Sequence, residues 1–382
     1  MARFTVASLF CGLGGLDLGF EWEDFKVTWA CDFGVAATES YNLNFETTPV
    51  LADISELPIA SIPTTDVIIG GPPCQAFSLA GQRRTDDPRG KLVFRFAEII
   101  RRKLPSAFVM ENVPGMISSK IDGRSLPDIL EEEFRAMGYR VRQMKLNALD
   151  YLVPQRRRRI VLVGTSGARP AIPDGRVFAK TLYGIDRSNY DRGAAAALGD
   201  LGPCAKKGMR SRYNDKAPSE FAALMRYKGG HDVSLHQCPR MSDTDRLFVA
   251  HIPPGGNYKD IPDEFSSARV MKHKQDGSRT TAYGRLHPRR PSYTINTYFR
   301  RPNVGSNFHY SEARLITPRE AMRLQSIPDD FELYYSHQDE RNALIGNAVP
   351  PLMARAIAWS LRLAMTGSNQ AKNVLDRIDR RA

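Results

Sequence analysis

Residues 4–15 have the sequence FTVASLFCGLGG, in which a short apolar run ends in a glycine-rich turn. An apolar run of this length, bounded by a turn, is typical of a buried β-strand. Glycines directly after the strand let the backbone turn tightly and approach a ligand closely at the start of the next helix. The stretch therefore predicts the first strand, turn and helix of an α/β fold, with a ligand near the turn.

The same alternation continues through the first 164 residues. Further apolar runs predict strands at residues 26–30, 66–70, 107–111 and 159–164. Helical patterns lie between them at residues 35–43, 92–103 and 125–137. Strands that alternate with helices predict a mainly parallel sheet with both faces covered, and ligands at the carboxyl ends of its strands.

The pattern changes after Gly164. Residues 165–310 are rich in Gly, Pro, Arg and Tyr and lack sustained periodicity, but they keep aromatic and aliphatic side chains, which predicts a smaller irregular lobe rather than disorder. At residues 317–320 the sequence TPRE predicts a capped helix start, and a last apolar helix is expected at 349–364. We therefore expect a main lobe from 1–164 and 311–364, a second lobe at 165–310 and a polar tail at 365–382.

The formal net charge of +12 is concentrated in the expected second lobe. Residues 165–310 carry 24 Lys and Arg against 13 Asp and Glu, whereas residues 1–164 carry 20 of each kind. A neutral body with one basic segment favours a polyanionic partner over scattered solvated charges. No stretch approaches 18 uncharged apolar residues and the N-terminus lacks the features of a signal peptide, so neither a membrane span nor secretion is predicted.

The chain has five cysteines, Cys11, Cys31, Cys74, Cys204 and Cys238. Their number is odd and no pair has C-x-x-C spacing, so the sequence predicts reduced thiols, without a disulfide framework or a zinc site. No other cluster of metal-ligating residues is evident.

Cys74 follows a backbone of unusual rigidity, in the sequence GGPPCQAFS at residues 70–78. A thiolate nucleophile needs a rigid backbone because its sulfur must approach an electrophilic carbon in one geometry. An inert core cysteine needs no such positioning. The polar segment 78–91 is predicted either as a lid over a substrate or as a plain surface loop.

Other polar residues follow the neighbouring strands. Glu111 ends the next strand and could reach the same pocket as Cys74, although an exposed loop acid is an equal alternative. In the arginine run after Gln155, strand alternation sends Arg157 and Arg159 to one face, and Arg156 and Arg158 to the other.

The cofactor end of the predicted sheet is distinctive. The glycine turn does not have G-x-G-x-x-G spacing, because Asp17 stands where the third glycine would be. Asp32 follows the second strand, about 20 residues after the glycines, and Asp53 and Ile54 follow a probable third strand. The pattern suits a nucleoside-bearing cofactor without a pyrophosphate, and by itself it is at least as consistent with an ordinary strand-to-helix turn.

Taken in order, six segments resemble the motifs of the cytosine-5 DNA methyltransferase family. They are residues 10–15 (FCGLGG), 72–75 (PPCQ), 111–113 (ENV), 155–159 (QRRRR), 314–325 (RLITPREAMRLQ) and 346–351 (GNAVPP). The resemblance covers about residues 4–164 and 311–364, with the family's variable recognition region between them. It implies a Rossmann-like S-adenosylmethionine-dependent methyltransferase sheet as the catalytic and cofactor-binding lobe, and a smaller irregular target-recognition lobe at 165–310.

The resemblance also implies the role of each site residue. Phe10 would stack on the adenine of S-adenosylmethionine and Asp32 would hold its ribose. Asp53 and Ile54 would contact the adenine, and the methionine side would be lined by Gly12, Gly14, Gly15 and Asn347. The product would be S-adenosylhomocysteine, and no metal is implied.

On the substrate side, Cys74 would be the nucleophile and Glu111 would bind the N3 and amino edge of a flipped cytosine. Arg157 and Arg159 would position the base and Glu111. The residues expected to contact the DNA substrate are Pro73, Gln75, Ser78, Arg89, Gln155 and Thr294.

Three alternatives remain open at this point. An RNA cytosine-5 methyltransferase is disfavoured because no Cys-Phe-Thr signature is present and the recognition segment is long. A non-catalytic DNA-binding protein on the same fold is disfavoured by the intact motifs, and an oxidoreductase by the glycine spacing. We expect a monomer that acts on duplex DNA in the cytoplasm or nucleoid of a prokaryote or phage host, with a separate companion endonuclease possible.

Overall fold

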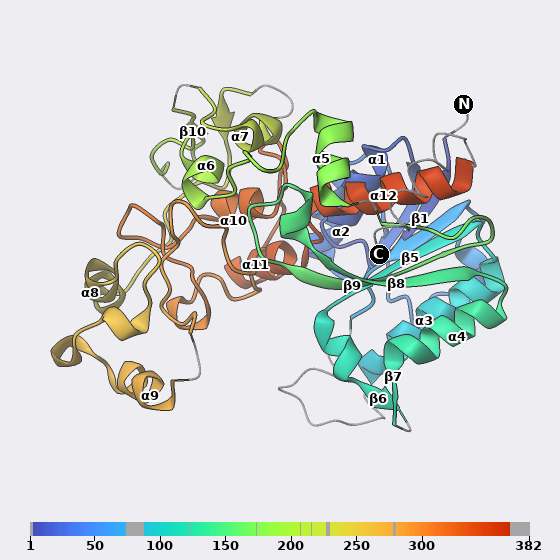
Figure 1. Cartoon of the computed structure of the whole chain (residues 1–382), viewed down its shortest axis with the longest axis horizontal. Helices are drawn as coiled ribbons and strands as arrows, with labels where there is room; N and C mark the ends of the chain where they lie inside the picture. The colour runs from blue at the N-terminus through green and yellow to red at the C-terminus, as the bar shows by residue number, and fades with distance from the viewer. Residues whose placement is uncertain are drawn as a thin grey trace. The chain divides into compact units, whose positions relative to one another are not determined.

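The structure is a computed structural model that describes residues 3–73, 88–121, 123–172, 174–206, 208–214, 216–226, 230–277 and 280–366. The chain divides into two compact units (Figure 1). The first unit comprises Met1–Tyr151, Arg158–Gly184 and Pro351–Ala382, and the second comprises Leu152–Arg157 and Ile185–Pro350.

A seven-stranded sheet forms the centre of the first unit, in the order β3-β2-β1-β4-β5-β9-β8. Every neighbouring pair is parallel except those made by β9, which runs antiparallel to both β5 and β8. The strands are β1 (Thr5–Leu9), β2 (Lys26–Asp32), β3 (Val50–Leu51), β4 (Val67–Gly70), β5 (Ala107–Asn112), β8 (Arg140–Asn147) and β9 (Arg158–Thr165). The mainly parallel α/β sheet predicted from the sequence is thus confirmed.

Helices cover both faces of this sheet (Figure 1). On one face lie α3 (Pro88–Lys103) and α4 (Leu126–Ala136), which contribute fully buried rings such as Phe96 and Phe134 to the core. On the other face lie α1 (Gly15–Glu21) and α12 (Pro351–Thr366). These two helices approach so closely that a Cβ on Gly19 would lie 2.4 Å from the Cβ of Ala354.

Shorter elements complete the first unit. They are α2 (Val35–Asn42), η1 (Ile59–Ser61), η3 (Pro114–Ser118), β6 (Lys120–Ile121), β7 (Arg124–Ser125), η4 (Ala148–Tyr151) and α5 (Gly175–Tyr183).

Strand β8 was not predicted from the sequence. Its eight residues alternate irregularly between buried and exposed positions, because β8 lies at the edge of the sheet and carries several polar side chains. A half-buried edge strand lacks the continuous apolar run by which the central strands are recognised.

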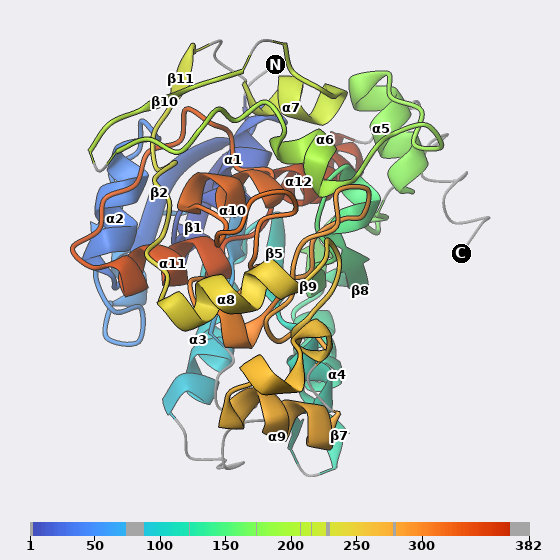
Figure 2. The same ribbon diagram turned by 90° about the vertical axis from the view of Figure 1, so that its left-hand side faces the viewer.

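The second unit contains little regular structure, as predicted for most of it. Figure 2 shows that α6, α7 and the β10–β11 pair lie at one end of this unit, whereas α8 and α9 lie at the other. A separate apolar cluster that includes Phe248, Tyr258 and Phe308 supports the α8–α9 end. The elements are α6 (Ala194–Leu198), β10 (Ser211–Arg212), α7 (Glu220–Met225), β11 (Asp232–Val233), α8 (Asp243–His251), η5 (Tyr258–Asp260), η6 (Asp263–Phe265), α9 (Ala268–Asp276), η7 (Pro302–Val304), α10 (Pro318–Leu324) and α11 (Gln338–Asn347).

Helix α10 begins as the sequence predicted, with a capping box between Thr317 and Glu320. The helix nevertheless packs in the second unit, and the chain returns to the first unit at Pro351 rather than at residue 311. The reason is electrostatic: the fully buried guanidinium of Arg323 forms ion pairs with Asp200 and Asp329, both in the second unit. An unpaired charge in this position would be very costly, so the pairs tie α10 to that unit. The assignment of catalytic and recognition roles to the two lobes stays a prediction.

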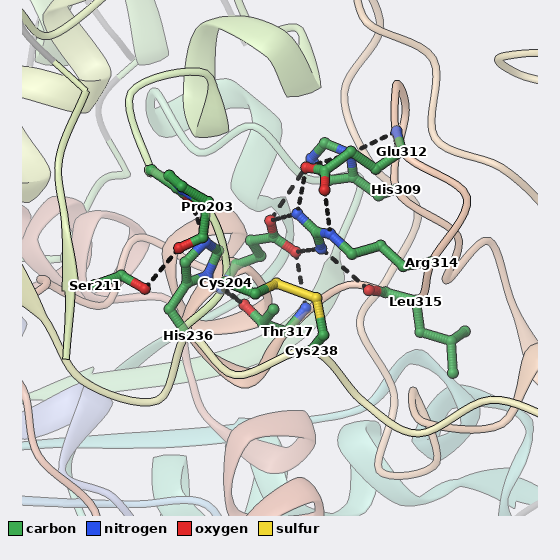
Figure 3. Close-up of a disulfide and its surroundings, with 12 residues drawn as sticks. Pro203, Cys204, Ser211, His236, Cys238, His309, Glu312, Arg314, Leu315 and Thr317 are labelled. Atoms are coloured by element: carbon green, nitrogen blue, oxygen red, sulfur yellow. Dashed lines mark hydrogen bonds and ion pairs between the residues drawn. A yellow bond between two sulfur atoms is a disulfide. The ribbon is translucent and has the colours of Figure 1, made fainter. Parts of the chain in front are cut away.

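Cys204 and Cys238 form a disulfide in the second unit, with their Cα atoms 5.5 Å apart (Figure 3). The expectation that all five cysteines are reduced thiols was therefore wrong for this pair, whereas Cys11 and Cys31 are free and buried. Ala205 donates its backbone N–H to the carbonyl of His236, which brings the two segments together. A separation of 34 residues carries no signal of this pairing, because only the tertiary fold decides which loops meet.

Among the described residues no helix is both long and apolar enough to cross a membrane. The same residues contain no cluster of three or more His, Cys, Asp or Glu arranged to hold a metal ion.

The disulfide predicts a thiol count. Under denaturing conditions without reductant, three of the five cysteines should react with a thiol reagent, and all five after reduction. Because the bond restricts the unfolded chain, reduction should also lower the free energy of unfolding, by roughly 4 kcal/mol for a loop of this length. The double variant Cys204→Ser/Cys238→Ser should be insensitive to reductant, and five reactive thiols without reductant would contradict the disulfide.

Candidate active site

The carboxyl ends of four strands lie at one edge of the sheet. Leu9 on β1 pairs with Cys31 on β2 and with Gly70 on β4, and Gly70 pairs with Met110 on β5. Because these strands are parallel and in register, the residues that follow them emerge at the same edge. The glycine turn after β1, Asp32 at the end of β2, the segment 71–73 after β4 and Glu111 on β5 are thereby brought to one end of the first unit.

The glycine turn after β1 is held by Asp32. Gly12 and Gly34 each donate a backbone N–H, over 2.9 Å, to separate oxygens of the Asp32 carboxylate. Burial raises the pKa of Asp32, and these two hydrogen bonds oppose the rise. Gly12 has φ +53°, and a Cβ built on it would meet nothing within 4 Å. The backbone at Gly12 therefore borders open space in which a ligand can approach it closely.

Three apolar residues near this edge differ in how far they are exposed. Phe10 is half-buried and packs against the core with φ 56°, and Ile54 is only 3% exposed. Phe33, which directly follows Asp32, is 74% exposed. Phe33 was not among the site residues predicted from the sequence, although an aromatic residue beside an acid at the end of a strand is a recognisable signal for a ligand contact.

Asp53 lies on the surface beside the same edge. Its Oδ1 accepts hydrogen bonds from the backbone N–H and the hydroxyl of Ser55, at 2.8 and 2.7 Å. The bonds from Ser55 lower the pKa of Asp53. The carboxylate is therefore ionised and can accept a further hydrogen bond from a ligand.

Asp17 is a buried acid in the first turn of α1, two residues after the last glycine of the turn. The hydroxyl of Tyr41 donates to Asp17 Oδ1 over 3.0 Å, and the Tyr41 ring stacks on Phe45. The Phe45 ring in turn leaves no room for a side chain on Gly14, whose Cβ would lie 2.3 Å from it. Burial raises the pKa of Asp17 to about 6, with the Tyr41 bond opposing part of the rise.

This raised pKa predicts a pH-dependent cost in stability. The cost of ionised Asp17 is absent below its unfolded pKa of 3.8, grows as the pH rises, and is complete above about 6. We expect Asp17→Asn to increase the free energy of unfolding by on the order of 2–3 kcal/mol at pH 8, and by progressively less between pH 6 and 4. Urea unfolding over this range measures the difference. The exposed acid variant Glu56→Gln should show no such trend, and a constant effect of Asp17→Asn across the range would contradict the interpretation.

Glu111 and Arg159 meet near the end of β5. The Nε of Arg159 lies 2.6 Å from Glu111 Oε1, and both side chains are 9% exposed. The antiparallel pairing of β5 with β9 places Glu111 opposite Val161, two residues from Arg159 on the same face of the sheet. The predicted pairing of Glu111 with Arg159 is therefore present in the first unit.

The segment that leads to Cys74 passes beside Glu111. A Cβ on Gly71 would lie 3.2 Å from Glu111 Oε2. Asn112 donates its side-chain amide to the carbonyl of Pro72 over 2.9 Å. Pro73 is the last described residue of this run, and Cys74, Gln75 and Ser78 lie outside the described residues. Arg89 belongs to the first turn of α3, but its side chain also lies outside the description, as does most of the segment predicted as a lid.

Arg157 does not share the surroundings of Arg159. It is fully buried in the second unit, where it donates to the carbonyls of Ile295 and Gly346 at 3.1 and 2.8 Å. The predicted alternation of the arginine run is nevertheless confirmed, since Arg157 and Arg159 are buried and Arg156 and Arg158 are exposed.

Three further predicted residues lie in the second unit with Arg157. Buried Gln155 donates to the carbonyl of Leu324, at 3.3 Å. Exposed Thr294 donates its hydroxyl to the carbonyl of Arg156 at 2.8 Å. Asn347 is exposed and directly follows Gly346, whose carbonyl binds Arg157. A Cβ on Gly346 would lie 2.4 Å from the backbone N of Thr297, so this backbone is closely packed.

The fold of the chain is that of a methyltransferase. A crystal structure of a DNA modification methyltransferase encoded within an E. coli prophage has a TM-score of 0.71, at 24% sequence identity, covering 95% of this chain and 100% of that one. Residues 4–362 match the family of C-5 cytosine-specific DNA methylases, and the chain belongs to this family.

Curated relatives support the same assignment over nearly the whole chain. The sequence is 32% identical over 385 residues to the Type II methyltransferase M.DdeI of Desulfomicrobium norvegicum, covering 93% of this chain and 87% of that protein. It is 31% identical over 372 residues to the Type II methyltransferase M.FnuDI of Fusobacterium nucleatum, covering 96% of both. The resemblance inferred from the six motifs is thereby confirmed, as is the prediction of an enzyme of this family. The family and fold use S-adenosylmethionine. An RNA methyltransferase or a non-catalytic binding protein is not favoured.

Proposed function

We propose that the protein methylates C5 of a cytosine flipped out of a specific duplex DNA sequence, through a covalent adduct with Cys74. One observation carries the proposal: the segment 71–73 runs beside the Glu111 carboxylate, which Arg159 holds, so that a Cβ on Gly71 would lie only 3.2 Å from Glu111 Oε2. This geometry brings the backbone next to the nucleophile and a group that can bind a base to the same end of the sheet.

The edge of the first unit fits S-adenosylmethionine, which supplies the methyl group when bound. Asp32 has its carboxylate fixed by two backbone amides and keeps lone pairs for ribose hydroxyls. Gly12 borders open space, and Gly14 and Gly15 begin the adjoining helix, so the turn forms a cradle for the amino acid part of the cofactor. We assign the adenine to the surface of Phe10, Phe33, Asp53 and Ile54, and Asn347 to the methionine side.

Exposed Phe33 offers the largest apolar surface for the adenine. An aromatic stack of this kind contributes about 1 kcal/mol, so Phe33→Ala should raise the Kd for S-adenosylmethionine by roughly five- to tenfold. Isothermal titration calorimetry measures the change. Because the ring is 74% exposed, the thermal midpoint without cofactor should stay unchanged. Leu43→Ala, at an exposed leucine at the end of α2, is the matched control. An unchanged Kd would assign the stacking to Phe10 alone.

Cys74, Glu111 and Arg159 have different roles in the proposed methylation. The Cys74 thiolate adds to C6 of the cytosine, which interrupts the aromatic ring and makes C5 nucleophilic. Glu111 binds the N3 and amino edge, so the charge that develops on the ring is stabilised, and Arg159 fixes the Glu111 carboxylate. Once C5 has accepted the methyl group, loss of the C5 proton to a base breaks the C6–S bond, which releases the thiolate and restores the aromatic ring. None of these steps is possible inside a stacked duplex, which is why the target must be flipped out.

The second unit is proposed to read the DNA. Its residues 185–310 carry 21 Lys and Arg against 12 Asp and Glu, an excess that suits phosphate contacts. We propose that Arg157 acts as a positioning residue, because its buried guanidinium links the backbone after Thr294 to the backbone before Asn347. The proposed DNA contacts are Pro73, Gln75, Ser78, Arg89, Gln155 and Thr294.

Duplex DNA that contains 5-fluorocytosine tests the proposal. Fluorine blocks loss of the proton from C5, so the protein should form a denaturant-stable adduct that requires S-adenosylmethionine and is absent in Cys74→Ser. Glu111→Gln should slow methyl transfer to normal DNA about 10²- to 10⁴-fold while the variant still binds S-adenosylmethionine. Radiolabel transfer and gel analysis measure both effects.

The outcomes separate the alternatives. An adduct with structured RNA but not with duplex DNA would overturn the choice of DNA. DNA binding without any adduct would favour a non-catalytic protein. An adduct that persists in Cys74→Ser would contradict the proposed nucleophile.

Three further properties belong to this proposal. We infer that the protein acts as a monomer without a metal ion, in the cytoplasm or nucleoid of a prokaryotic or phage-infected cell. The relatives named above are Type II methyltransferases, which supports a role in restriction–modification alongside a separate endonuclease.

A further inference from the structure

A pocket of about 290 Å³ lies in the first unit at the ends of β8 and β9. Helix η3, which follows the Glu111 strand, forms its side wall. Its described lining combines apolar residues such as Ile117 and Leu146 with cations and an amide, and includes no acid; the polar members are Lys145, Asn147, Arg158 and Arg159.

The register of β8 and β9 explains why polar groups converge here. Asn147 pairs with Arg158 and Lys145 pairs with Ile160 across the two strands. Residues directly opposite each other share a face, as do residues two apart along one strand. Lys145, Asn147 and Arg158 therefore project from the same face of the sheet, toward the pocket.

The charges of this pocket are available for a ligand. Lys145 and Arg158 are exposed, and neither forms an ion pair within the part of the chain that the structure describes. The third cation, Arg159, forms an ion pair with Glu111 and donates to the carbonyl of Arg158 over 2.8 Å. The pocket thus adjoins the group proposed to bind the flipped cytosine.

We propose that this pocket binds a backbone phosphate of the DNA beside the flipped cytosine. The inference rests on the proposed function, since it places a part of the same substrate. Lysine and arginine with an amide donor are the groups that bind phosphate oxygens. A contact here would hold the backbone next to Glu111 and offset part of the cost of flipping.

The carboxylate of the cofactor is a poorer candidate for this pocket. The glycine turn and Asp32 follow β1 and β2, whereas β9 and β8 lie on the other side of β4 and β5 in the sheet order. A cofactor in the glycine cradle therefore does not reach the pocket, and S-adenosylmethionine binding should not depend on its charges.

The double variant Lys145→Gln/Arg158→Gln tests the proposal through the salt dependence of DNA binding. Neutralising one phosphate contact should weaken binding and reduce the slope of log K against log salt concentration by about one. The Kd for S-adenosylmethionine should not change. The matched control, Arg102→Gln/Lys103→Gln, removes the same charge at the last turn of α3, near the start of β5 rather than its end, and its slope should equal that of the unmodified protein.

Chemical substitution of single phosphates in the DNA identifies the one that binds in the pocket. Once bisulfite sequencing has mapped the target, each phosphate near the target cytosine is replaced singly by a neutral methylphosphonate. One of these replacements should weaken binding to the unmodified protein, but have no further effect on the double variant. Inorganic phosphate, titrated as a competitor, should displace DNA from the pocket only weakly if the backbone is the true ligand.

The results distinguish the two proposals. An unchanged slope in the double variant, or equal sensitivity of both proteins to every methylphosphonate, would overturn the phosphate site. Inorganic phosphate could compete strongly while no methylphosphonate loses its effect in the double variant. That result would assign the pocket to a free anion instead. Failure of the methyltransferase proposal shows separately, as the absence of a 5-fluorocytosine adduct in the unmodified protein.

Discussion

The parallel register of β1, β2, β4 and β5 is the constraint on which the candidate active site depends. Because each strand runs in the same direction and the next is reached through a helical crossover, the chain leaves all four at one edge. That edge receives the glycine turn, Asp32, the segment before Cys74 and Glu111, which are far apart in the sequence. The core beneath them, with α3 and α4 packed on one face, fixes the strands rigidly. A site built at strand ends thus keeps its geometry while the adjoining loops differ.

Strand β9 adds a second constraint, because it is the antiparallel member of the sheet. Its direction brings Arg159 back toward Glu111, and its alternation sends Arg158 to the opposite face beside Asn147. Both arginines line the cationic pocket, but Arg159 is buried and paired with a carboxylate, whereas Arg158 is exposed.

Buried arginines organise the second unit, which has little regular structure to do so. Arg157, Arg319 and Arg323 are fully buried, and their guanidinium groups bind backbone carbonyls or carboxylates from distant segments. Arg314 likewise holds Glu320, and although burial alone would raise the pKa of Glu320, the bonds from Arg314 lower it to about 2. Each guanidinium offers five donors in a fixed plane, so one side chain can join several loops. The charged motif at residues 314–325 is in this respect part of the framework of the unit.

The α/β sheet, most of its strands, the capped start of α10 and the family could be predicted from the sequence, because periodicity, capping residues and ordered motifs are local properties. So could the pairing of Glu111 with Arg159 and the alternation of the arginine run. Three other features follow from contacts between distant segments: Arg157 has separate partners, residues 311–350 pack with the second unit, and Cys204 meets Cys238. The tertiary structure alone revealed the exposure of Phe33 and the pocket beside Lys145. These features depend on which distant segments come together, and the packing of the whole chain sets those contacts rather than any residue's neighbours in sequence.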